Sequence, residues 1–285
     1  IAILDIILAY FVLKNVTKKT DPKLDVLSIV LSTFGFGGIL YAFSVAGSSG
    51  WGSTEVIVGG TIGLITLVWF IRRQFKLEQP ILEFRVMKYK MFTITTVLSM
   101  IAFIAVIGAA VILPMYMQTM LGFTAFESGL ALLLGAILQG IANPITGRLF
   151  DRFGARWLAI SGMFLLAVST FLFAILTTET SFTYISIIHA LRMTSVSMVM
   201  MPVTTAGLNL LPTHLIAHGT AVSNTLRQVS GSIGTALPIT LMTTFTIPDK
   251  GVEGMIYGVN ISFIFSGIVA LVGFIMAFYI KDRRN

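Results

Sequence analysis

Long apolar runs separated by short polar segments dominate the chain. Runs of about 20 apolar residues can cross the hydrocarbon core of a bilayer. Because lipid cannot satisfy backbone polar groups, such segments must be helical. The pattern predicts an all-α, polytopic transmembrane helical bundle. After a partial first helix, the expected spans are Leu24–Gly47, Val56–Ile71, Met91–Met117, Ala125–Thr146, Leu158–Thr177, Phe182–Leu211, Ala221–Ile247 and Ile256–Ile280.

Basic residues are unevenly divided between the connections. Lysine and arginine collect in residues 14–23, 72–90 and 147–157 and after the last span, whereas the connections on the opposite side hold a single lysine. Because short basic loops stay in the cytoplasm, this bias sets the orientation. We expect Gly147–Trp157, with its three arginines, to be a short cytoplasmic turn between antiparallel helices. The C-terminus is expected on the same side.

Composition supports a membrane protein and excludes several other classes. Hydrophobic residues make up 56% of the 285 residues and charged residues 11%, where a soluble domain carries roughly 25% charged residues. The net charge of +7 lies in short clusters at connections, so we expect no nucleic-acid partner. The absence of cysteine excludes disulfides and thiolate chemistry. Because the chain starts inside an apolar run, we expect it to be the downstream part of a longer protein.

No arrangement of residues in the sequence indicates catalysis. An enzyme would need a nucleophile with its base, paired carboxylates, a metal cluster or a phosphate loop, and none is found. His189, His214 and His218 lack a second ligand at metal-binding spacing. We therefore expect no enzyme, no metal and no cofactor.

Charged residues inside the expected spans carry more information, because charge in hydrocarbon is costly and tends to line a pathway or to be paired. Arg192 lies about ten residues inside its span, near mid-depth. Arg227 lies about two turns into the next span, where it could reach the cytoplasmic surface. Asp5 is a candidate protonatable carboxylate. All three are candidates for proton coupling, and a structural role for each stays open.

Two further groups of residues are candidates for a cavity or for packing. Tyr116 and Gln118, near the outer end of their span, are candidates for a cavity mouth, with interfacial anchoring as the alternative. Met193 and Met198 belong to an adaptable methionine cluster of the kind that promiscuous sites use, with core or lipid-facing packing as the alternative. The glycine-rich stretches 35–38 and 231–234 predict close helix contacts.

Two motifs resemble the major facilitator superfamily. Residues 147–156, GRLFDRFGAR, resemble its cytoplasmic loop motif, Gly-x-Leu-small-Asp-Arg-x-Gly-Arg-Arg. Residues 219–236, GTAVSNTLRQVSGSIGTA, resemble the late-helix signature of the fourteen-spanner drug:proton antiporters within that superfamily. The signature positions here are Gly219, Asn224, Gln228, Gly231 and Gly234.

The resemblance implies a domain organisation. By this alignment, residues 1–13 correspond to the end of the sixth helix, 14–23 to a cytoplasmic loop, and 24–71 to two extra helices that link the halves. Residues 72–90 correspond to a cytoplasmic link and 91–285 to the C-terminal six-helix half. The N-terminal half, which holds most of the family's membrane carboxylates, would be a missing partner.

The resemblance also implies proton-coupled efflux of amphipathic, often cationic, drug-like compounds across the plasma membrane by alternating access. The partners would be a small amphipathic substrate, protons, the lipid bilayer and the N-terminal half, with a proton gradient in place of a cofactor. Two alternatives stay open: a transporter of the same fold that exports an amino acid, a lipid or a siderophore, and a non-transporting scaffold, sensor or inactive half.

Particular residues acquire roles through the resemblance. Arg192 corresponds by position to an arginine that the family implicates in proton transfer. Asp151 is expected to cap a neighbouring helix and to pair with an arginine, favouring one conformation. The gating-loop candidates are Gly147, Asp151, Arg152, Gly154 and Arg156.

Overall fold

A computed structural model describes residues 25–281 as a bundle of α-helices, with no strand among these residues. The predicted all-α fold is therefore confirmed. Residues 1–13 and 14–23, and with them Asp5, lie outside the described residues. The helices are α2 (Val26–Ser49), α3 (Thr54–Gln74), α4 (Lys90–Met115), α5 (Ala125–Phe153), α6 (Ala155–Leu172), α7 (Phe182–Asn209), α8 (Ile216–Phe245) and α9 (Gly251–Ala277).

Short turns of other helix types complete the described chain. Four are 3-10 helices and one is a π-helix, which directly follows α4. The 3-10 turns are η1 (Phe84–Lys88), η3 (Phe173–Ile175), η4 (Thr213–Leu215) and η5 (Pro248–Lys250), and the π-helical turn is η2 (Tyr116–Met120).

Seven of the described helices are long and apolar enough to cross a membrane. The exception is α8, which has 30 residues and at 1.5 Å per residue is roughly 45 Å long. Helix α8 is therefore long enough to cross a membrane. It is less apolar than the other helices because it contains serine, threonine, amide and arginine side chains. Helix α8 packs between α2 on one side and α4 and α9 on the other, and Ser223 and Ser230 are buried in these contacts.

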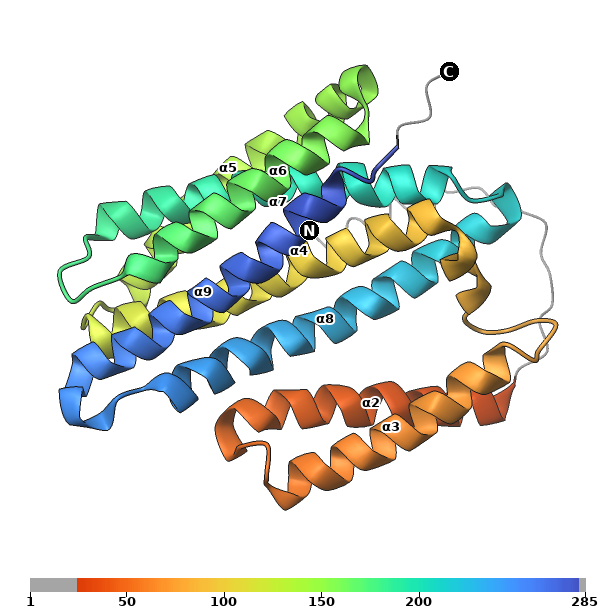
Figure 1. Cartoon of the computed structure of the whole chain (residues 1–285), viewed down its shortest axis with the longest axis horizontal. Coiled ribbons are helices and arrows are strands. Elements are labelled where there is room, and N and C mark those ends of the chain that lie inside the picture. Colours follow the sequence, from red (N-terminus) through yellow and green to blue (C-terminus); the bar gives the residue numbers. More distant parts are fainter. Residues whose placement is uncertain (1–24, 282–285) are drawn as a thin grey trace, which may run out of the picture.

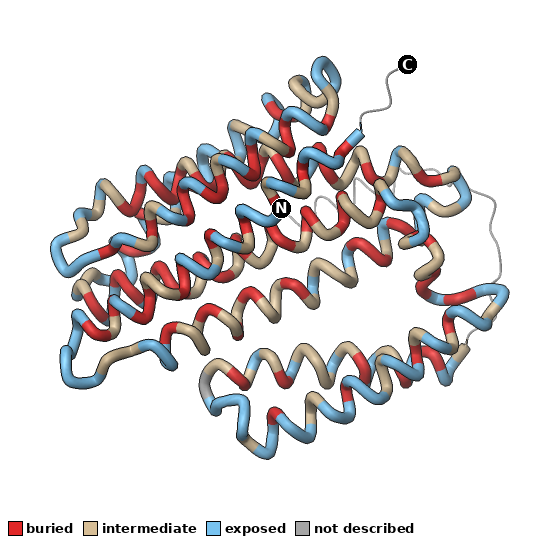
Figure 2. Tube along the Cα trace, viewed as in Figure 1, coloured by how far each residue is buried: buried red, intermediate tan, exposed pale blue. Residues whose placement is uncertain are grey.

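The bundle has a buried centre, and α2, α3 and α5 are its more exposed helices. Figure 1 shows the α2–α3 hairpin beside α8 at one edge and the α5–α6 hairpin at the opposite edge. Between them, α7 packs against α4, α5 and α6, and α4 packs against α8 and α9. The apolar windows of α4 and α7 are 56% and 61% buried, against 22% and 17% in α2 and α3, a contrast visible in Figure 2. Helices α4 and α7 thus form the core.

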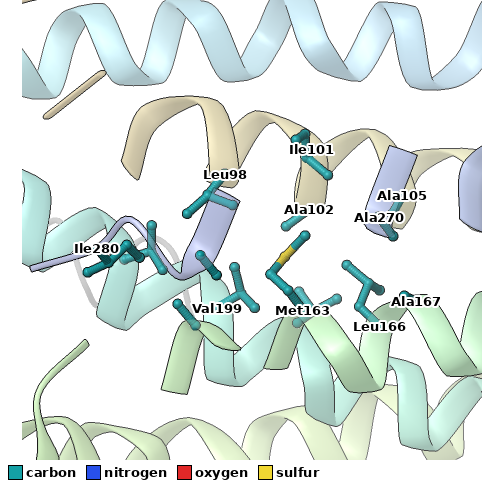
Figure 3. Close-up of a cluster of buried hydrophobic side chains, with 14 of the residues drawn as sticks. Leu98, Ile101, Ala102, Ala105, Met163, Leu166, Ala167, Val199, Ala270 and Ile280 are labelled. Carbon is teal, nitrogen blue, oxygen red and sulfur yellow. The ribbon is translucent and has the colours of Figure 1, made fainter. Parts of the chain in front are cut away.

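Small side chains allow the central helices to approach closely. A buried cluster joins α4, α6, α7 and α9, and Figure 3 shows Met163 of α6 pointing toward Ala102 of α4. In the α2–α3 hairpin, a methyl group added to Gly38 would lie 2.8 Å from the carbonyl oxygen of Gly59. On α8, a methyl group added to Gly234 would lie 2.8 Å from the carbonyl oxygen of Ile104. Both predicted glycine stretches therefore lie at helix contacts.

The carboxylate of Asp25 links the start of α2 to the end of α3. It accepts hydrogen bonds from the backbone N–H of Ser28 (3.3 Å) and from the Ser28 hydroxyl (2.6 Å). The guanidinium of Arg73 donates to both carboxylate oxygens at 3.0 Å. The buried side chain of Gln74 donates to Ser28 Oγ (2.8 Å) and accepts from the backbone N–H of Leu82 (3.2 Å). This network ties the hairpin to the link that precedes α4.

Acid should weaken the contacts of the Asp25 carboxylate with Arg73 and Ser28. Hydrogen bonding from Arg73, and secondarily from Ser28, lowers the pKa of Asp25 from 3.8 to about 2. A carboxyl group whose pKa is lower in the folded state stabilises that state above its unfolded pKa, and the contribution is lost as the pH falls toward 2. We expect the contribution of Asp25 to thermal stability in detergent to be constant above about pH 5 and to decline below it. The Asp25→Asn variant should lack that contribution, and an identical acid decline in both proteins would contradict the prediction.

The expected turn at Gly147–Trp157 is wrong in its extent. Helix α5 continues to Phe153 and α6 begins at Ala155, so the single residue Gly154 joins them. Gly154 has φ +80°, which glycine adopts without steric cost, and its N–H donates to the carbonyl oxygen of Phe150 (2.9 Å). Hydropathy marks where the apolar run ends, whereas a helix continues as long as its own backbone hydrogen bonds are satisfied.

Candidate functional site

A cavity of about 500 Å³ lies between α4, α5, α7 and α8. Its volume and its mixture of apolar surface with a few polar groups are typical of small-molecule sites. It is the candidate functional site. The apolar lining comes from Phe103, Val106, Val196, Met200 and Met201, and the polar lining from Gln139, Asn143, Ser197, Thr204, Thr205 and Arg227.

Helices α5 and α7 supply most of the polar lining. The Ser197 hydroxyl lies within hydrogen-bond distance of Asn143 Oδ1 (2.5 Å) and of the Gln139 carbonyl oxygen (3.1 Å). The side-chain amide of Gln139 and Nδ2 of Asn143 have no hydrogen-bond partner among the described residues. Sequence reasoning missed these residues. The available signal was the i, i+4 spacing of Gln139 and Asn143, which places two amides on one face of an apolar helix.

Arg227 is the only charged residue in the lining of this cavity. Its Nη2 donates to Oδ1 of Asn224, one turn earlier on α8, and its other guanidinium nitrogens have no partner among the described residues. Helix α8 begins earlier than the expected span, so Arg227 is further from the helix end than expected. Because η4 leads directly into α8 at Ile216, Arg227 lies about 16 Å along the helix, at 1.5 Å per residue. The backbone of Arg227 is therefore about three turns from the start of α8.

Arg192 is fully buried and is not part of the lining. Its Nη2 donates to the carbonyl oxygen of Ala105 on α4 (2.6 Å), and its Cζ lies 5.9 Å from the centre of the Phe263 ring. Nε and Nη1 have no hydrogen-bond partner among the described residues. One turn further along α7, Val196 does line the cavity. Arg192 thus joins α7 to α4 beside the site.

His189 lies one turn before Arg192 and is also buried. It packs against Gly135 of α5, and its Nδ1 lacks a hydrogen-bond partner among the described residues. His214 belongs to η4 and His218 to the first turn of α8. Residues 25–281 contain no group of three side chains placed to hold a metal ion.

Carboxylates in residues 25–281 are confined to helix ends and connections. Arg192 and Arg227 are the only charged residues there that lie more than two turns from both ends of their helices. The described interior therefore carries positive charge without a compensating carboxylate. The acidic residues in question are Asp25, Glu55, Glu78, Glu83, Glu127, Asp151, Glu179, Asp249 and Glu253.

Tyr116 and Gln118 do not line this cavity, and their expected place at a cavity mouth stays a prediction. The buried Tyr116 hydroxyl donates to the carbonyl oxygen of Thr177 (2.6 Å), and Gln118 Nε2 donates to Ser128 Oγ (2.7 Å). Both residues belong to the π-helical turn that follows Pro114. Because a π-helical turn has an extra residue, it rotates side chains away from the faces of an ideal helix.

Met193 and Met198 are not among the residues that line the cavity. A methyl group added to Gly135 of α5 would lie 2.9 Å from Met193 Cγ, and one added to Gly162 of α6 would lie 2.9 Å from Met198 Cβ. Their neighbours Met200 and Met201 line the cavity instead. Successive residues of a helix point about 100° apart, so a methionine cluster in the sequence does not reveal which member faces the site.

The α5–α6 junction borders a second cavity of about 540 Å³, whose lining includes Asp151, Arg152, Gly154 and Lys281. Helix α6 begins without a side-chain cap, and Asp151 forms no ion pair with the described residues. The expected capping and pairing by Asp151 are therefore wrong for this conformation. Because α5 is longer than expected, Asp151 lies in its last turn.

Other motif residues near this junction are helical. Gly147 is in α5, where a methyl group added to it would approach only Met201, at 3.9 Å, and Arg156 is in the first turn of α6. The Arg152 guanidinium lies 5.1 Å from the centre of the Phe153 ring.

The late-helix signature lies entirely on α8 and includes several contacts with α4. A methyl group added to Gly231 would lie 2.9 Å from Phe103 Cε1, and Gln228 lines a smaller cavity beside that ring. Gly219 packs against Phe92, Leu208 and Leu211. Together with Gly234, these residues bring α8 close to the core helices.

Comparison with known proteins identifies relatives among transporters. The sequence pattern of the Major Facilitator Superfamily matches residues 12–235. The chain is 46% identical over 288 residues to YcnB of Bacillus subtilis, described as an uncharacterised MFS-type transporter, and this match covers 100% of the chain and 61% of YcnB. It is 42% identical over 282 residues to the lincomycin resistance protein LmrB of Listeria monocytogenes, covering 95% of the chain and 60% of LmrB.

A more distant match is to the multidrug export protein EmrB of Escherichia coli, which is 26% identical over 230 residues, covering 80% of the chain and 45% of EmrB. The chain spans about 60% of the length of the two more similar relatives.

Proposed function

The chain belongs to the Major Facilitator Superfamily, and on that premise we propose that it is part of a proton-coupled exporter of amphipathic drug-like compounds. Helices α4 to α9 form one six-helix half of an alternating-access transporter, and α2 and α3 link it to the other half. The exporter resides in the plasma membrane with the α5–α6 junction in the cytoplasm. The drug-resistance names of several relatives support this proposal.

The cavity between α4, α5, α7 and α8 carries the proposal. Transporters of this kind bind substrate near the bilayer midplane, where their two repeats meet. Apolar side chains such as Phe103 and Met200 and the amides of α5 offer an amphipathic compound both kinds of contact. The described interior has no carboxylate, so the protonatable group belongs to residues outside 25–281, and Asp5 is one candidate. Arg192 and Arg227 then influence the proton equilibrium by their charge.

Substrate-coupled proton flux tests this function. The full-length protein that contains this chain would be reconstituted into vesicles loaded with a pH-sensitive dye, with lincomycin as the first probe. We expect lincomycin to trigger proton movement that protein-free vesicles lack, and an imposed pH gradient to drive lincomycin accumulation. Lincomycin binding without proton movement or accumulation would favour a non-transporting protein. A proton-coupled response to an amino acid, a lipid or a siderophore and not to lincomycin would favour a different cargo.

A further inference from the structure

The polar lining of the candidate site contains several hydrogen-bond donors that have no acceptor among the described residues. Arg227 uses only Nη2 within the described residues, in its contact with Asn224. Across the cavity on α5, Nδ2 of Asn143 and the amide of Gln139 are also unpartnered among these residues, because Ser197 is bonded to the oxygen of Asn143 and to the backbone of Gln139. Donors from two helices thus border one cavity.

The charge around this cavity has a single sign. Among residues 25–281, Arg227 contributes a positive charge to the lining and Arg192 contributes another beside it, and no carboxylate lies away from the helix ends. Charges at mid-depth in a membrane protein act through a medium of low dielectric constant, so their fields are weakly screened. A cationic group in the cavity would be repelled, whereas a carboxylate, phosphate or amide carbonyl would accept hydrogen bonds from the donors.

We propose that the donors of Arg227, Gln139 and Asn143 bind the anionic or acceptor-rich end of an amphipathic compound, and that Arg227 selects against a cationic group at that position. The ring of Phe103 and the side chains of Met200 and Met201 contact the apolar part of the same compound. The inference rests on the proposed function only in taking this cavity as the substrate site. It narrows the group bound at these donors to an anion or an uncharged hydrogen-bond acceptor. A substrate with a basic amine elsewhere, such as lincomycin, would place its acceptor-rich end here.

Equilibrium binding of two dyes tests the charge preference without requiring transport. Fluorescein and rhodamine 123 share a xanthene framework and carry opposite charge near neutral pH. Fluorescence anisotropy would be measured with the full-length protein in detergent. We expect fluorescein to bind more tightly than rhodamine 123. Arg227→Gln should weaken fluorescein binding about tenfold, the usual consequence of losing one charge-assisted contact, and should leave rhodamine 123 binding unchanged or tighter.

Three further variants make the result specific to Arg227. Arg227→Lys keeps the charge and should retain part of the preference for fluorescein, because lysine lacks the planar fork of arginine. Arg227→Glu should reverse the preference. Lys250→Gln, which removes a distant positive charge in η5, should change neither affinity.

Several outcomes would overturn the inference: tighter binding of rhodamine 123, no binding of fluorescein, or equal affinities in wild type and Arg227→Gln. The last result is expected if a carboxylate elsewhere in the protein neutralises Arg227. Failure of the proposed function looks different, because selective fluorescein binding would persist while the vesicles show no proton-coupled transport.

Discussion

Arg192→Met is expected to leave the bundle folded and to lower proton-coupled transport by roughly 5- to 150-fold. The folded state should tolerate the change because the Arg192 guanidinium makes one hydrogen bond and leaves two nitrogens without a partner among the described residues. An apolar side chain of similar volume avoids the desolvation cost of a buried charge, and replacing buried ion pairs in this way is often neutral or stabilising. Methionine also fits irregular space well.

The loss of transport follows from the charge that the variant removes. Arg192 lies one turn from Val196, which lines the cavity. The electric field of its guanidinium raises the free energy of a second positive charge or a proton nearby. Coupling free energies between two binding sites are typically about 1–3 kcal/mol, or roughly 5- to 150-fold in affinity. The expected loss of transport takes the weakened coupling of proton and substrate binding as its cause.

Stability and transport must be measured separately for this residue. Arg192→Ala should destabilise the protein by about 3–5 kcal/mol, as expected for truncation of a large buried side chain. Thermal unfolding in detergent and proton flux in vesicles would be compared for wild type, the methionine variant and the alanine variant. Wild-type transport by a stable Arg192→Met protein would restrict Arg192 to a structural link between α7 and α4.

Gly38→Val is expected to separate α2 from α3 and to lower stability by about 1–3 kcal/mol or more. A methyl group at this position would lie 2.8 Å from the carbonyl oxygen of Gly59 and 2.8 Å from the Cα of Gly63. Both obstacles are backbone atoms, which cannot move aside by changing rotamer. For a chain of this size the loss corresponds to a fall of several degrees in melting temperature.

The adjacent residue provides a matched control. A methyl group added to Gly37 meets nothing within 4 Å, so Gly37→Val introduces the same side chain one position away without a clash. Thermal unfolding of the purified protein should show a clear decrease for the first variant and little change for the second. Equal decreases in both variants would mean that helix propensity, and not the α2–α3 contact, determines the loss.

The helical fold was predictable from the sequence because its cause is local. A run of about 20 apolar residues must form a helix in lipid whatever surrounds it, so each expected span overlaps a helix of the structure. Errors appeared at helix ends. The α5–α6 junction is the single residue Gly154, and α8 begins at Ile216, earlier than expected. Hydropathy indicates which residues contact lipid and does not indicate where backbone hydrogen bonding stops.

The candidate site was only partly predictable. Arg227 was recognisable as a charge in an apolar setting, and its position on α8 brings it into the cavity lining. Gln139 and Asn143 are uncharged and belong to no motif, so nothing distinguished them until α5 and α7 were packed together. Tyr116 belongs to a π-helical turn and not to the lining of this cavity, and hydropathy does not reveal such a turn.

The sequence by itself determined the membrane environment, the helical spans, the predicted orientation and the family, because lipid burial, loop charge and motif spacing depend on neighbours along the chain. The tertiary structure alone decided that Arg192 is buried against Ala105 and that Arg227 lines the cavity. These facts depend on which helix faces meet. That choice is made by glycine contacts and side-chain packing between segments far apart in sequence.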